Sequence, residues 1–288
     1  MLRMNPESPN SKEFTSQVFG TQNPVAVLIP EPDSVPTRSF VGREELVAQC
    51  MAAWLDIEGE GALHFRVTGP PGVGKNELIY FLAREVEQKP LYIMHGHEEL
   101  TPEDVACTAR VTKDNRVEYV GSPLLAAMVN GGICFFDEIG KVPSRSLSLL
   151  ASVLDDRRTL TSVLAGFSVR AKPGFRFCAA MNDADAATYG LPGYIDERLR
   201  PAFKLDYPPI DEVMTIVGNG IKHATTTLLD RFRMWATSQK SLSPREALTM
   251  IGYAARLHAQ KGGGTMTTQD ADRLLERSAR DVHDNKTV

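Results

Sequence analysis

A glycine-rich segment has the residue types and spacing of a phosphate-binding loop. It reads Gly69-Pro-Pro-Gly-Val-Gly-Lys-Asn76 and lies between an apolar run, 63–68, and a segment of helical character, 75–87. In such a strand–loop–helix unit, backbone N–H groups and the helix N-terminus converge on an anion, and the lysine contacts the terminal phosphates. The segment therefore predicts a nucleotide site. The residues assigned to nucleotide binding are Gly69, Pro70, Pro71, Gly72, Val73, Gly74, Lys75, Asn76 and Glu77.

The last position of this loop departs from the usual pattern. The motif has Ser or Thr there, whose hydroxyl ligates Mg²⁺, whereas this chain has Asn76. An amide oxygen can also ligate Mg²⁺, although it is less well placed than a hydroxyl. We therefore expect Asn76 to be a metal ligand, with nucleotide binding retained and turnover slowed.

An apolar run that ends in two acidic residues is the second candidate for chemistry. In Ile133-Cys-Phe-Phe-Asp137-Glu138, Asp137 falls at the C-terminal edge of an expected strand, where a doubly wound sheet binds its ligand. A carboxylate there can hold Mg²⁺ through water, and Glu138 is placed to orient or deprotonate the attacking water. Taken alone, the pair is equally well explained as a solvated strand end. The phosphate loop upstream favours the catalytic interpretation.

Polar residues near two later strands are further candidates. Asn182 ends the run Phe177-Cys-Ala-Ala-Met-Asn182, where it could bridge the water and the γ-phosphate or simply cap the strand as a turn residue. Arg198 and Arg200 precede an expected edge strand. From there they could reach the γ-phosphate of a neighbouring subunit, or form an ordinary solvated face.

Arg245 is a candidate because of its place in an expected helix. Ser243 fits an N-cap and Pro244 the first helical turn, so Arg245 lies near a helix start. Helix electrostatics do not favour a cation there, which makes a bound anion a reasonable explanation. A solvated arginine in a first turn is the alternative.

Short apolar runs alternate with helical segments from residue 64 to 207, as in a doubly wound sheet whose parallel strands are buried on both faces. The expected strands are 64–68, 91–94, 133–136, 175–180 and 203–207. The expected helices between them are 77–86, 124–129 and 146–154, and another reaches Trp54. Two β-hairpins, near 108–122 and 157–174, interrupt this pattern.

The two ends of the chain differ from this central part. Residues 1–38 are polar and rich in proline, which predicts an extended arm that is ordered only where the apolar run 25–29 docks. After Pro208-Pro209, helical spacing without strands near 211–218, 221–238, 244–258 and 268–282 predicts a small helical domain. The expected domains are therefore the arm 1–38, an αβα nucleotide-binding domain 39–209 and a helical domain 210–288.

Composition restricts the class of protein. The chain has 288 residues and a net charge of −4, which argues against broad electrostatic capture of nucleic acid or an anionic membrane. Widely spaced cysteines and the lack of a membrane-length apolar stretch or a signal peptide predict a cytoplasmic protein. His95 and His97 lie beside glutamates, but no Cys or His follows at ligand spacing, so the sequence gives a metal role there little support.

The order and spacing of these motifs resemble AAA+ ATPases of the MoxR branch, nearest to NorQ/CbbQ-type members, over about residues 40–260. The resemblance covers the phosphate loop, the Walker B run 133–138, Asn182 as first sensor and Arg245 as part of a second sensor. It implies an α/β fold, with a doubly wound P-loop AAA+ core and a smaller C-terminal all-helical lid. It also implies ATP and Mg²⁺ as cofactors, with metal ligands Asn76 and Asp137.

The same resemblance implies how such a protein works. It predicts a homo-hexameric ring with ATP between subunits, where Arg198 or Arg200, with Arg198 favoured, is the trans arginine finger. The catalytic residues would be Glu138, Asn182, Arg198 and Arg200. Proteins of this branch are chaperone-like activators that remodel or assemble a protein client, often a metalloenzyme, often alongside a von Willebrand factor A adaptor.

Two other functions stay open from the sequence. A nucleic-acid motor or loader would use basic hairpin residues such as Arg110 and Arg158, but the hairpins also carry acidic residues and no aromatic ladder for base stacking. ATPase stimulation by DNA or RNA would favour it. A nucleotide-sensing scaffold with weak hydrolysis is the third reading, which Asn76 motivates. Single-turnover kinetics would separate it from a slow motor.

Overall fold

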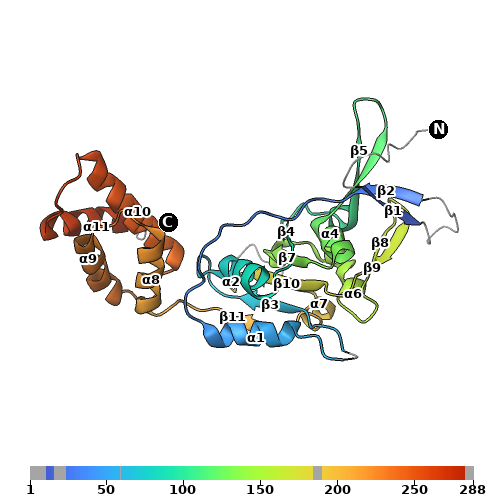
Figure 1. The fold of residues 1–288 in the computed structure, drawn as a ribbon, viewed down its shortest axis with the longest axis horizontal. Helices are drawn as coiled ribbons and strands as arrows, with labels where there is room; N and C mark the ends of the chain where they lie inside the picture. Colours follow the sequence, from blue (N-terminus) through green and yellow to red (C-terminus); the bar gives the residue numbers. More distant parts are fainter. Residues whose placement is uncertain (1–10, 16–23, 59, 184–189, 283–288) are drawn as a thin grey trace. The chain divides into compact units, whose positions relative to one another are not determined.

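The computed structural model describes residues 11–15, 24–58, 60–183 and 190–282, and the chain divides into two compact units (Figure 1). The first unit consists of residues 44–68 and 76–204 together with the N-terminal segment up to residue 39. The second unit consists of residues 40–43, 69–75 and 205–288. Each unit is described by itself.

A five-stranded parallel sheet forms the centre of the first unit. Its order is β11-β3-β10-β7-β4, and every neighbouring pair is parallel. The strands are β3 (Phe65–Thr68), β4 (Leu91–His95), β7 (Ile133–Asp137), β10 (Arg176–Met181) and β11 (Ala202–Lys204). Buried apolar residues fill β7 and β10, because central parallel strands are covered on both faces. The predicted doubly wound sheet is confirmed.

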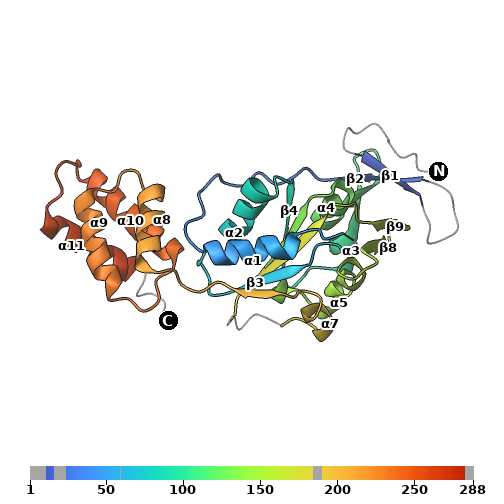
Figure 2. The same ribbon diagram turned by 60° about the horizontal axis from the view of Figure 1, so that its bottom comes forward.

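Helices cover both faces of this sheet (Figure 2). Along β7, Cys134 and Phe136 share a core cluster with the buried residues of α4 (Pro123–Asn130). On the opposite face, Tyr80 of α2 (Lys75–Phe81) contacts Phe135 edge-on. The two-residue period of a strand therefore places α4 and α2 on opposite faces. Trp54, at the end of α1 (Glu44–Trp54), packs on Phe65.

Local sequence explains where several of these helices begin and end. The Ser122 hydroxyl accepts a hydrogen bond from the Leu125 N–H and so caps α4, and Gly131 closes the helix in a left-handed conformation. The remaining short elements of the first unit are η1 (Leu82–Val86, a π-helical continuation of α2), α3 (Pro102–Ala106), η2 (Ile139–Lys141), α5 (Ser144–Leu147), α6 (Leu150–Val153) and α7 (Gly193–Asp196).

Two predicted elements differ from the structure. The strand expected over 203–207 ends at Lys204, because Lys204 pairs with Thr68, the last residue of the neighbouring strand β3. The helix expected over 146–154 is split into α5 and α6. The Ser148 hydroxyl donates to the Arg145 carbonyl at 2.7 Å, a local bond that competes with continuous helix.

A second sheet joins the N-terminal segment to the first predicted hairpin. Its order is β1-β2-β6-β5, with β1 (Ser11–Thr15), β2 (Pro24–Leu28), β5 (Cys107–Val111) and β6 (Val117–Gly121). Strand β2 pairs in parallel with β6, and its Val27 is fully buried. Docking of the apolar run is therefore confirmed. The second predicted hairpin is also present, as β8 (Thr159–Ser162) and β9 (Phe167–Arg170).

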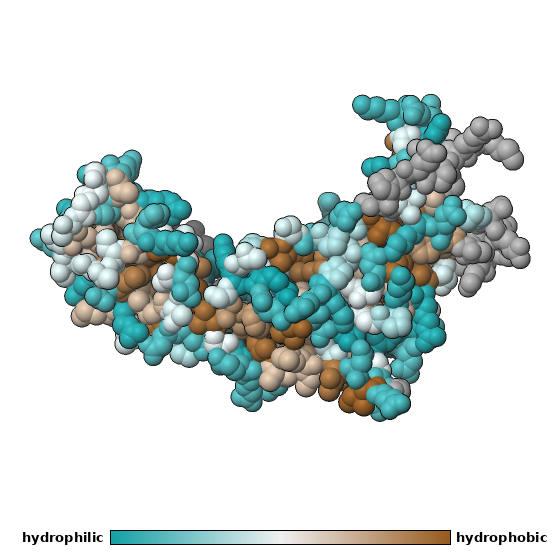
Figure 3. Space-filling view, viewed as in Figure 1, coloured by the Kyte–Doolittle hydropathy of each residue, from teal (hydrophilic) through white to brown (hydrophobic). Residues whose placement is uncertain are grey.

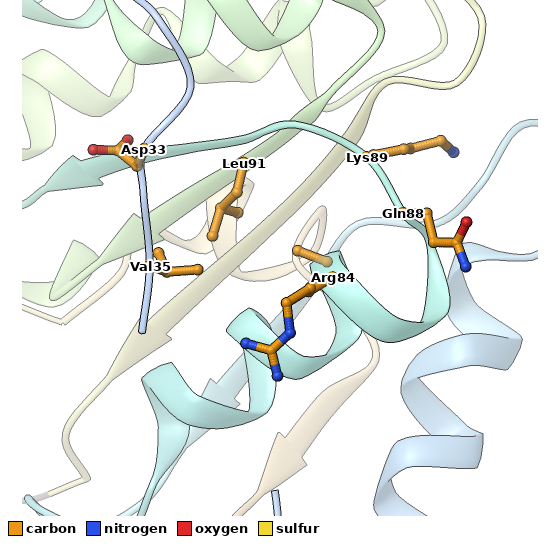
Figure 4. A pocket seen from close by; sticks show the side chains of 7 residues that line it. Asp33, Val35, Arg84, Gln88, Lys89 and Leu91 are labelled. Atoms are coloured by element: carbon orange, nitrogen blue, oxygen red, sulfur yellow. The ribbon is translucent and has the colours of Figure 1, made fainter. Parts of the chain in front are cut away.

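The arm is held over a longer stretch than expected, because residues 33–38 also bind the rest of the first unit. The Asp33 N–H donates to the Leu91 carbonyl at 2.8 Å, and the Ile93 N–H donates to Asp33 Oδ2 at 2.6 Å. The Arg84 guanidinium donates to the carbonyls of Pro36 and Arg38, both at 3.0 Å. The arm thus covers the open edge of β4, and a hollow of about 370 Å³ lies beside it (Figure 4).

Helices form the second unit. They are α8 (Ile210–Gly220), α9 (Thr226–Thr237), α10 (Pro244–Gln260) and α11 (Thr268–Val282), packed around a core that includes Val217, Phe232 and Met250. The predicted helical segment is confirmed, with one difference in a boundary. Helix α9 was expected from residue 221 but begins at Thr226, because the Thr225 hydroxyl accepts from the Leu228 N–H and caps it.

A buried histidine in the first unit makes the stability of the fold depend on pH. His64 is 5% exposed and packs against Phe175 and Phe177, and its Nδ1 has no hydrogen-bond partner among the described residues. Burial, followed by the positive charges of Arg158 and Arg176, lowers the pKa of His64 from 6.5 to about 3. The native protein therefore keeps this imidazole neutral where the unfolded chain protonates it.

Acid should therefore destabilise the protein through His64. The unfolded chain binds the extra proton below pH 6.5 and the native state only near pH 3, so stability falls as pH falls through this window. The expected loss is about 2 kcal/mol between pH 7 and pH 5. Urea titrations at both pH values should show this loss in the wild type and in His97→Gln, an exposed control. His64→Phe should abolish it; an unchanged loss in His64→Phe would contradict the assignment.

Candidate nucleotide-binding site

The phosphate loop, residues 69–75, lies in the second unit and needs glycine at two positions for steric reasons. A Cβ on Gly69 would lie 2.1 Å from the Leu205 carbonyl oxygen. Gly72 has a φ of +79°, and a Cβ on it would lie 2.9 Å from Ser243 Oγ. The loop therefore packs closely against the start of α10, a proximity that the sequence did not predict.

Lys75 begins helix α2 and turns its side chain back over the loop. Its Nζ donates to the carbonyls of Gly69 at 2.7 Å and Pro70 at 2.9 Å, and the residue is only 8% exposed. The ammonium group is therefore held within the curl of the loop, close to a helix N-terminus. Both features favour an anion at this place. Glu77, in the first turn of α2, forms an ion pair with Arg38 at 3.4 Å.

Arg245 lies in the first turn of α10, as predicted, next to the phosphate loop. Ser243 and Glu246 form a capping box, in which the Ser243 hydroxyl accepts from the Glu246 N–H and the Glu246 carboxylate accepts from the Ser243 N–H. The Arg245 N–H lies 3.4 Å from the Gly72 carbonyl oxygen. The second unit thus brings its candidate anion-binding arginine and the loop together.

The acidic strand end lies in the first unit and contacts the residue that follows the loop lysine. Asp137 is the last residue of β7, and its Oδ1 accepts from the Glu138 N–H at 3.0 Å. Its Oδ2 accepts from Asn76 Nδ2 at 2.7 Å. The structure therefore brings together the two residues that the sequence assigned to the metal.

The residue types of this pair suit Mg²⁺, which prefers carboxylate and amide oxygens as ligands. In this structure Asn76 turns its amide nitrogen toward Asp137, so its amide must rotate by half a turn before its oxygen can take part with the carboxylate. Tyr80 holds the amide from the next turn of α2 through a side-chain hydrogen bond. Burial raises the pKa of Tyr80 more than the bond to Asn76 lowers it, so the hydroxyl stays protonated at neutral pH.

Glu138 follows Asp137 with an unusual backbone. Its φ of +54° is in the left-handed region, which is uncommon for a residue other than glycine. The side chain is 43% exposed, and Oε2 lies 2.9 Å from Lys141 Nζ. An exposed carboxylate beside the candidate metal ligand is accessible to water.

Asn182 and the two arginines lie at opposite ends of the parallel strands. Asn182 directly follows β10, the neighbour of β7, whereas residues 184–189 after it lie outside the described part of the chain. Arg198 and Arg200 precede β11, at the other edge of the sheet, with β3 and β10 between β11 and β7. Arg198 donates to the Tyr194 carbonyl at 2.7 Å, and Arg200 pairs with Asp196 at 2.9 Å.

His95 is a neighbour of Asp137 to which the sequence gave little support. It is the last residue of β4 and pairs in register with Asp137 of β7. Its Nδ1 lies 3.9 Å from Asp137 Oδ2. The only sequence signal was a histidine at an expected strand end, because nothing local shows that β4 and β7 are neighbours.

Comparison with known proteins supports the fold described above. Residues 64–203 match the AAA domain family, dynein-related subfamily. A mutant of Thermotoga maritima RuvB superposes with a TM-score of 0.59 at 16% identity, over 83% of this chain and 71% of that one, which shows the fold alone. The chain therefore contains a P-loop AAA fold, and the predicted fold class is confirmed.

Two curated relatives are similar to this chain over about two thirds of its length. Denitrification regulatory protein NirQ of Stutzerimonas stutzeri is 28% identical over 206 residues, 67% of this chain and 68% of that protein. NirQ of Pseudomonas aeruginosa PAO1 is 28% identical over 203 residues, 66% of this chain and 74% of that protein. The predicted resemblance to MoxR-type AAA+ ATPases is confirmed.

Two further findings concern the membrane and other metals. None of the helices in the described ranges combines the length and the apolarity that crossing a bilayer requires. Within the same ranges, no three His, Cys, Asp or Glu side chains gather as a metal-binding group. Cys50, Cys107, Cys134 and Cys178 are buried and form no disulfide.

Proposed function

We propose that this protein binds and hydrolyses ATP to remodel a protein partner. The observation that carries the proposal is the hydrogen bond between Asn76 and Asp137 at 2.7 Å. It joins the position after the phosphate-loop lysine to the end of the acidic strand, where the sequence predicts phosphate and metal binding. The match of residues 64–203 to an AAA domain and the similarity of the chain to NirQ also support an ATP-dependent activity.

Each candidate residue has a role in this proposal. Residues 69–77 bind the phosphates, and Arg245 contacts them from the start of α10. Glu138 orients and deprotonates the attacking water, and Asn182 bridges that water and the γ-phosphate. Asn76 and Asp137 would hold Mg²⁺, which supplies charge neutralisation at the phosphates when it is bound.

The position of the two arginines before β11 supports an ATP site to which a second copy of the chain contributes an arginine. Within one chain, β11 is separated from β7 by two strands, so Arg198 lies at the far edge of the sheet from Asp137 and His95. An arginine at this edge is suited to act in trans. AAA+ proteins commonly form oligomeric rings. We therefore propose a homo-hexamer, with Arg198 rather than Arg200 as the finger.

The side chains of the two hairpins favour a protein, rather than a nucleic acid, as the client. Arg110 of the first hairpin pairs with Glu118 at 2.8 Å, and Arg158 beside the second donates to the Ala62 carbonyl, so two basic groups are engaged internally. Large apolar side chains are exposed instead, with Val163 at the β8–β9 turn 72% exposed. The β5–β6 hairpin projects from the first unit as a largely hydrophilic surface (Figure 3). Exposed apolar groups at a turn suit contact with a protein.

The remaining parts of the proposal follow the MoxR resemblance. The core, 39–209, would hydrolyse ATP, and the lid, 210–288, would change with the bound nucleotide. The arm, 1–38, would support the first hairpin. The client would be a protein that needs activation or assembly, such as a metalloenzyme, with a von Willebrand factor A adaptor as a second partner. The protein would act in the cytoplasm.

Replacing the loop lysine tests the nucleotide assignment. Lys75→Ala should abolish ATP binding and hydrolysis, because it removes the ammonium that is held within the loop. Lys89→Ala is the matched control, since Lys89 pairs with Glu87 away from the loop and should leave both unchanged. Binding of a fluorescent ATP analogue and phosphate release would measure the two properties. Equal binding by Lys75→Ala and the wild type would refute the proposed site.

A further inference from the structure

An arginine of the neighbouring strand holds the segment that carries Arg198. Arg66 lies within β3, which runs beside β11, and its backbone N–H donates to the Pro201 carbonyl at 3.3 Å (Figure 1). Phe65 packs on Trp54 of α1, so Arg66, the next residue of the strand, points to the other face of the sheet. Its side chain is only 13% exposed. Arg66 is therefore packed against the chain before β11 instead of extending into solvent.

The Arg66 guanidinium binds this segment on both sides of Arg198. Its Nη1 donates to the Asp196 carbonyl at 3.1 Å and to the Leu199 carbonyl at 3.2 Å, two residues before Arg198 and one residue after it. Its Nη2 pairs with Asp196 Oδ1 at 2.7 Å. Carbonyl groups at the end of a helix lack partners within that helix, and Arg66 supplies one for Asp196, the last residue of α7.

The backbone of this segment is fixed, whereas the Arg198 guanidinium lies at the surface. Ile195 and Leu199 on either side of Arg198 are fully buried, and the bonds from Arg66 add to this anchoring. The Arg198 guanidinium donates to the Tyr194 carbonyl at 2.7 Å in an exposed position, where another subunit can reach it. A fixed backbone lowers the entropy that is lost when an exposed side chain binds its target.

Arg66 also lies on the strand that leads into the phosphate loop. Strand β3 ends at Thr68, and the loop begins with Gly69. A substitution of Arg66 can therefore act in two ways, on the loop of its own chain or on the arginine that this chain presents to another. Every bond of its side chain described above goes to the Arg198 segment, which favours the second way.

We propose that Arg66 is a positioning residue for the trans arginine finger, because it fixes the turn from which Arg198 reaches the ATP of a second copy. The inference rests on the proposed function and adds to it a residue that touches neither nucleotide nor metal. Arg66→Met should lower the turnover of the assembled protein by about 10–100-fold, since a small displacement of a catalytic group has an effect of this size.

Binding of a non-hydrolysable ATP analogue shows whether the variant is folded. Arg66→Met should bind it within about twofold of the wild type, because its own phosphate loop is unchanged. Arg84→Met is the matched control. Arg84 likewise donates to two backbone carbonyls of the same unit, those of Pro36 and Arg38, and its loss should leave turnover unchanged.

Mixing with Glu138→Gln subunits shows in which chain Arg66 acts. Arg66→Met subunits keep Glu138, and Glu138→Gln subunits keep both Arg66 and Arg198. Where a Glu138→Gln subunit presents its finger to an Arg66→Met subunit, the site has both groups in place, so turnover per Arg66→Met subunit should rise several-fold. No rise, although the subunits assemble together, would show that Arg66 acts on its own loop and would overturn the inference.

Two further variants separate positioning from a general loss of stability. In the Arg198→Ala background, Arg66→Met should slow single-turnover hydrolysis no further, because the group that it positions is absent. A further loss of about tenfold there would overturn the positioning role. Arg66→Lys keeps a charge beside Asp196 but not the forked guanidinium, so its turnover should lie between those of the wild type and Arg66→Met. It replaces Arg66→Met in the mixing test if Arg66→Met fails to bind the analogue.

The outcomes distinguish this inference from the proposed function. Normal turnover in Arg66→Met, while Arg198→Ala is slow, would overturn the role of Arg66 and leave the arginine finger standing. Normal turnover in Arg198→Ala would overturn both roles and leave ATP binding standing. Failure of the wild type to bind the analogue would overturn the proposed function together with this inference.

Discussion

The Glu138→Gln variant should bind ATP normally and hydrolyse it about 10²–10⁴-fold more slowly, the range expected for loss of a general base. Glutamine has the size of glutamate but cannot accept a proton from the attacking water. The structure supports this role, because the left-handed backbone after β7 places an accessible carboxylate beside Asp137. Phosphate release and equilibrium ATP binding would measure the two properties separately.

A second substitution distinguishes lost chemistry from a lost ion pair. Glu138→Gln also removes the 2.9 Å pair with Lys141, so Lys141→Met is the matched control, which breaks the pair and keeps the carboxylate. We expect Lys141→Met to retain most of the turnover. Near-normal turnover in Glu138→Gln would show that another group activates the water. Because Glu138→Gln keeps ATP bound, this variant should also retain the protein client in a pull-down.

Arg198→Ala should lower the turnover of the assembled protein by about 10³–10⁵-fold, as loss of an arginine finger does in other phosphoryl-transfer enzymes. Arg200→Ala should have a much smaller effect, because the Arg200 guanidinium already pairs with the Asp196 carboxylate. ATP binding should be unchanged in both variants, since neither arginine is part of the phosphate loop. Steady-state hydrolysis at concentrations that favour assembly would measure the difference.

Mixing two inactive variants tests whether the finger acts in trans. Arg198→Ala subunits keep Glu138, and Glu138→Gln subunits keep Arg198, so a mixed assembly contains some sites with both groups. Turnover should therefore recover on mixing. A mixture that stays inactive, although the subunits assemble together, would place Arg198 and Glu138 in the same site of one chain. Equal losses in Arg198→Ala and Arg200→Ala would remove the preference for Arg198.

Local signals allowed much of the fold to be predicted. The glycine loop and the buried apolar runs identified β3, β7 and β10, and the turn residues identified both hairpins. Ser243 and Pro244 marked the start of α10 because a capping hydroxyl and an N-terminal proline act within one helical turn. The errors were also local. Side-chain bonds of Ser148 and Thr225 split or delayed helices that apolar spacing alone predicted to be continuous.

By itself, the sequence determined the class of fold and predicted the phosphate loop and the metal residues, because these patterns depend on neighbours within a strand or a helical turn. Only the tertiary structure decided which strand ends are adjacent. It placed His95 beside Asp137, joined β2 to β6 and packed Gly72 against Ser243. The physical reason is that parallel pairing and helix packing bring together residues that are far apart in the chain, and the partner of a strand is set by the competition of all strands for the same core.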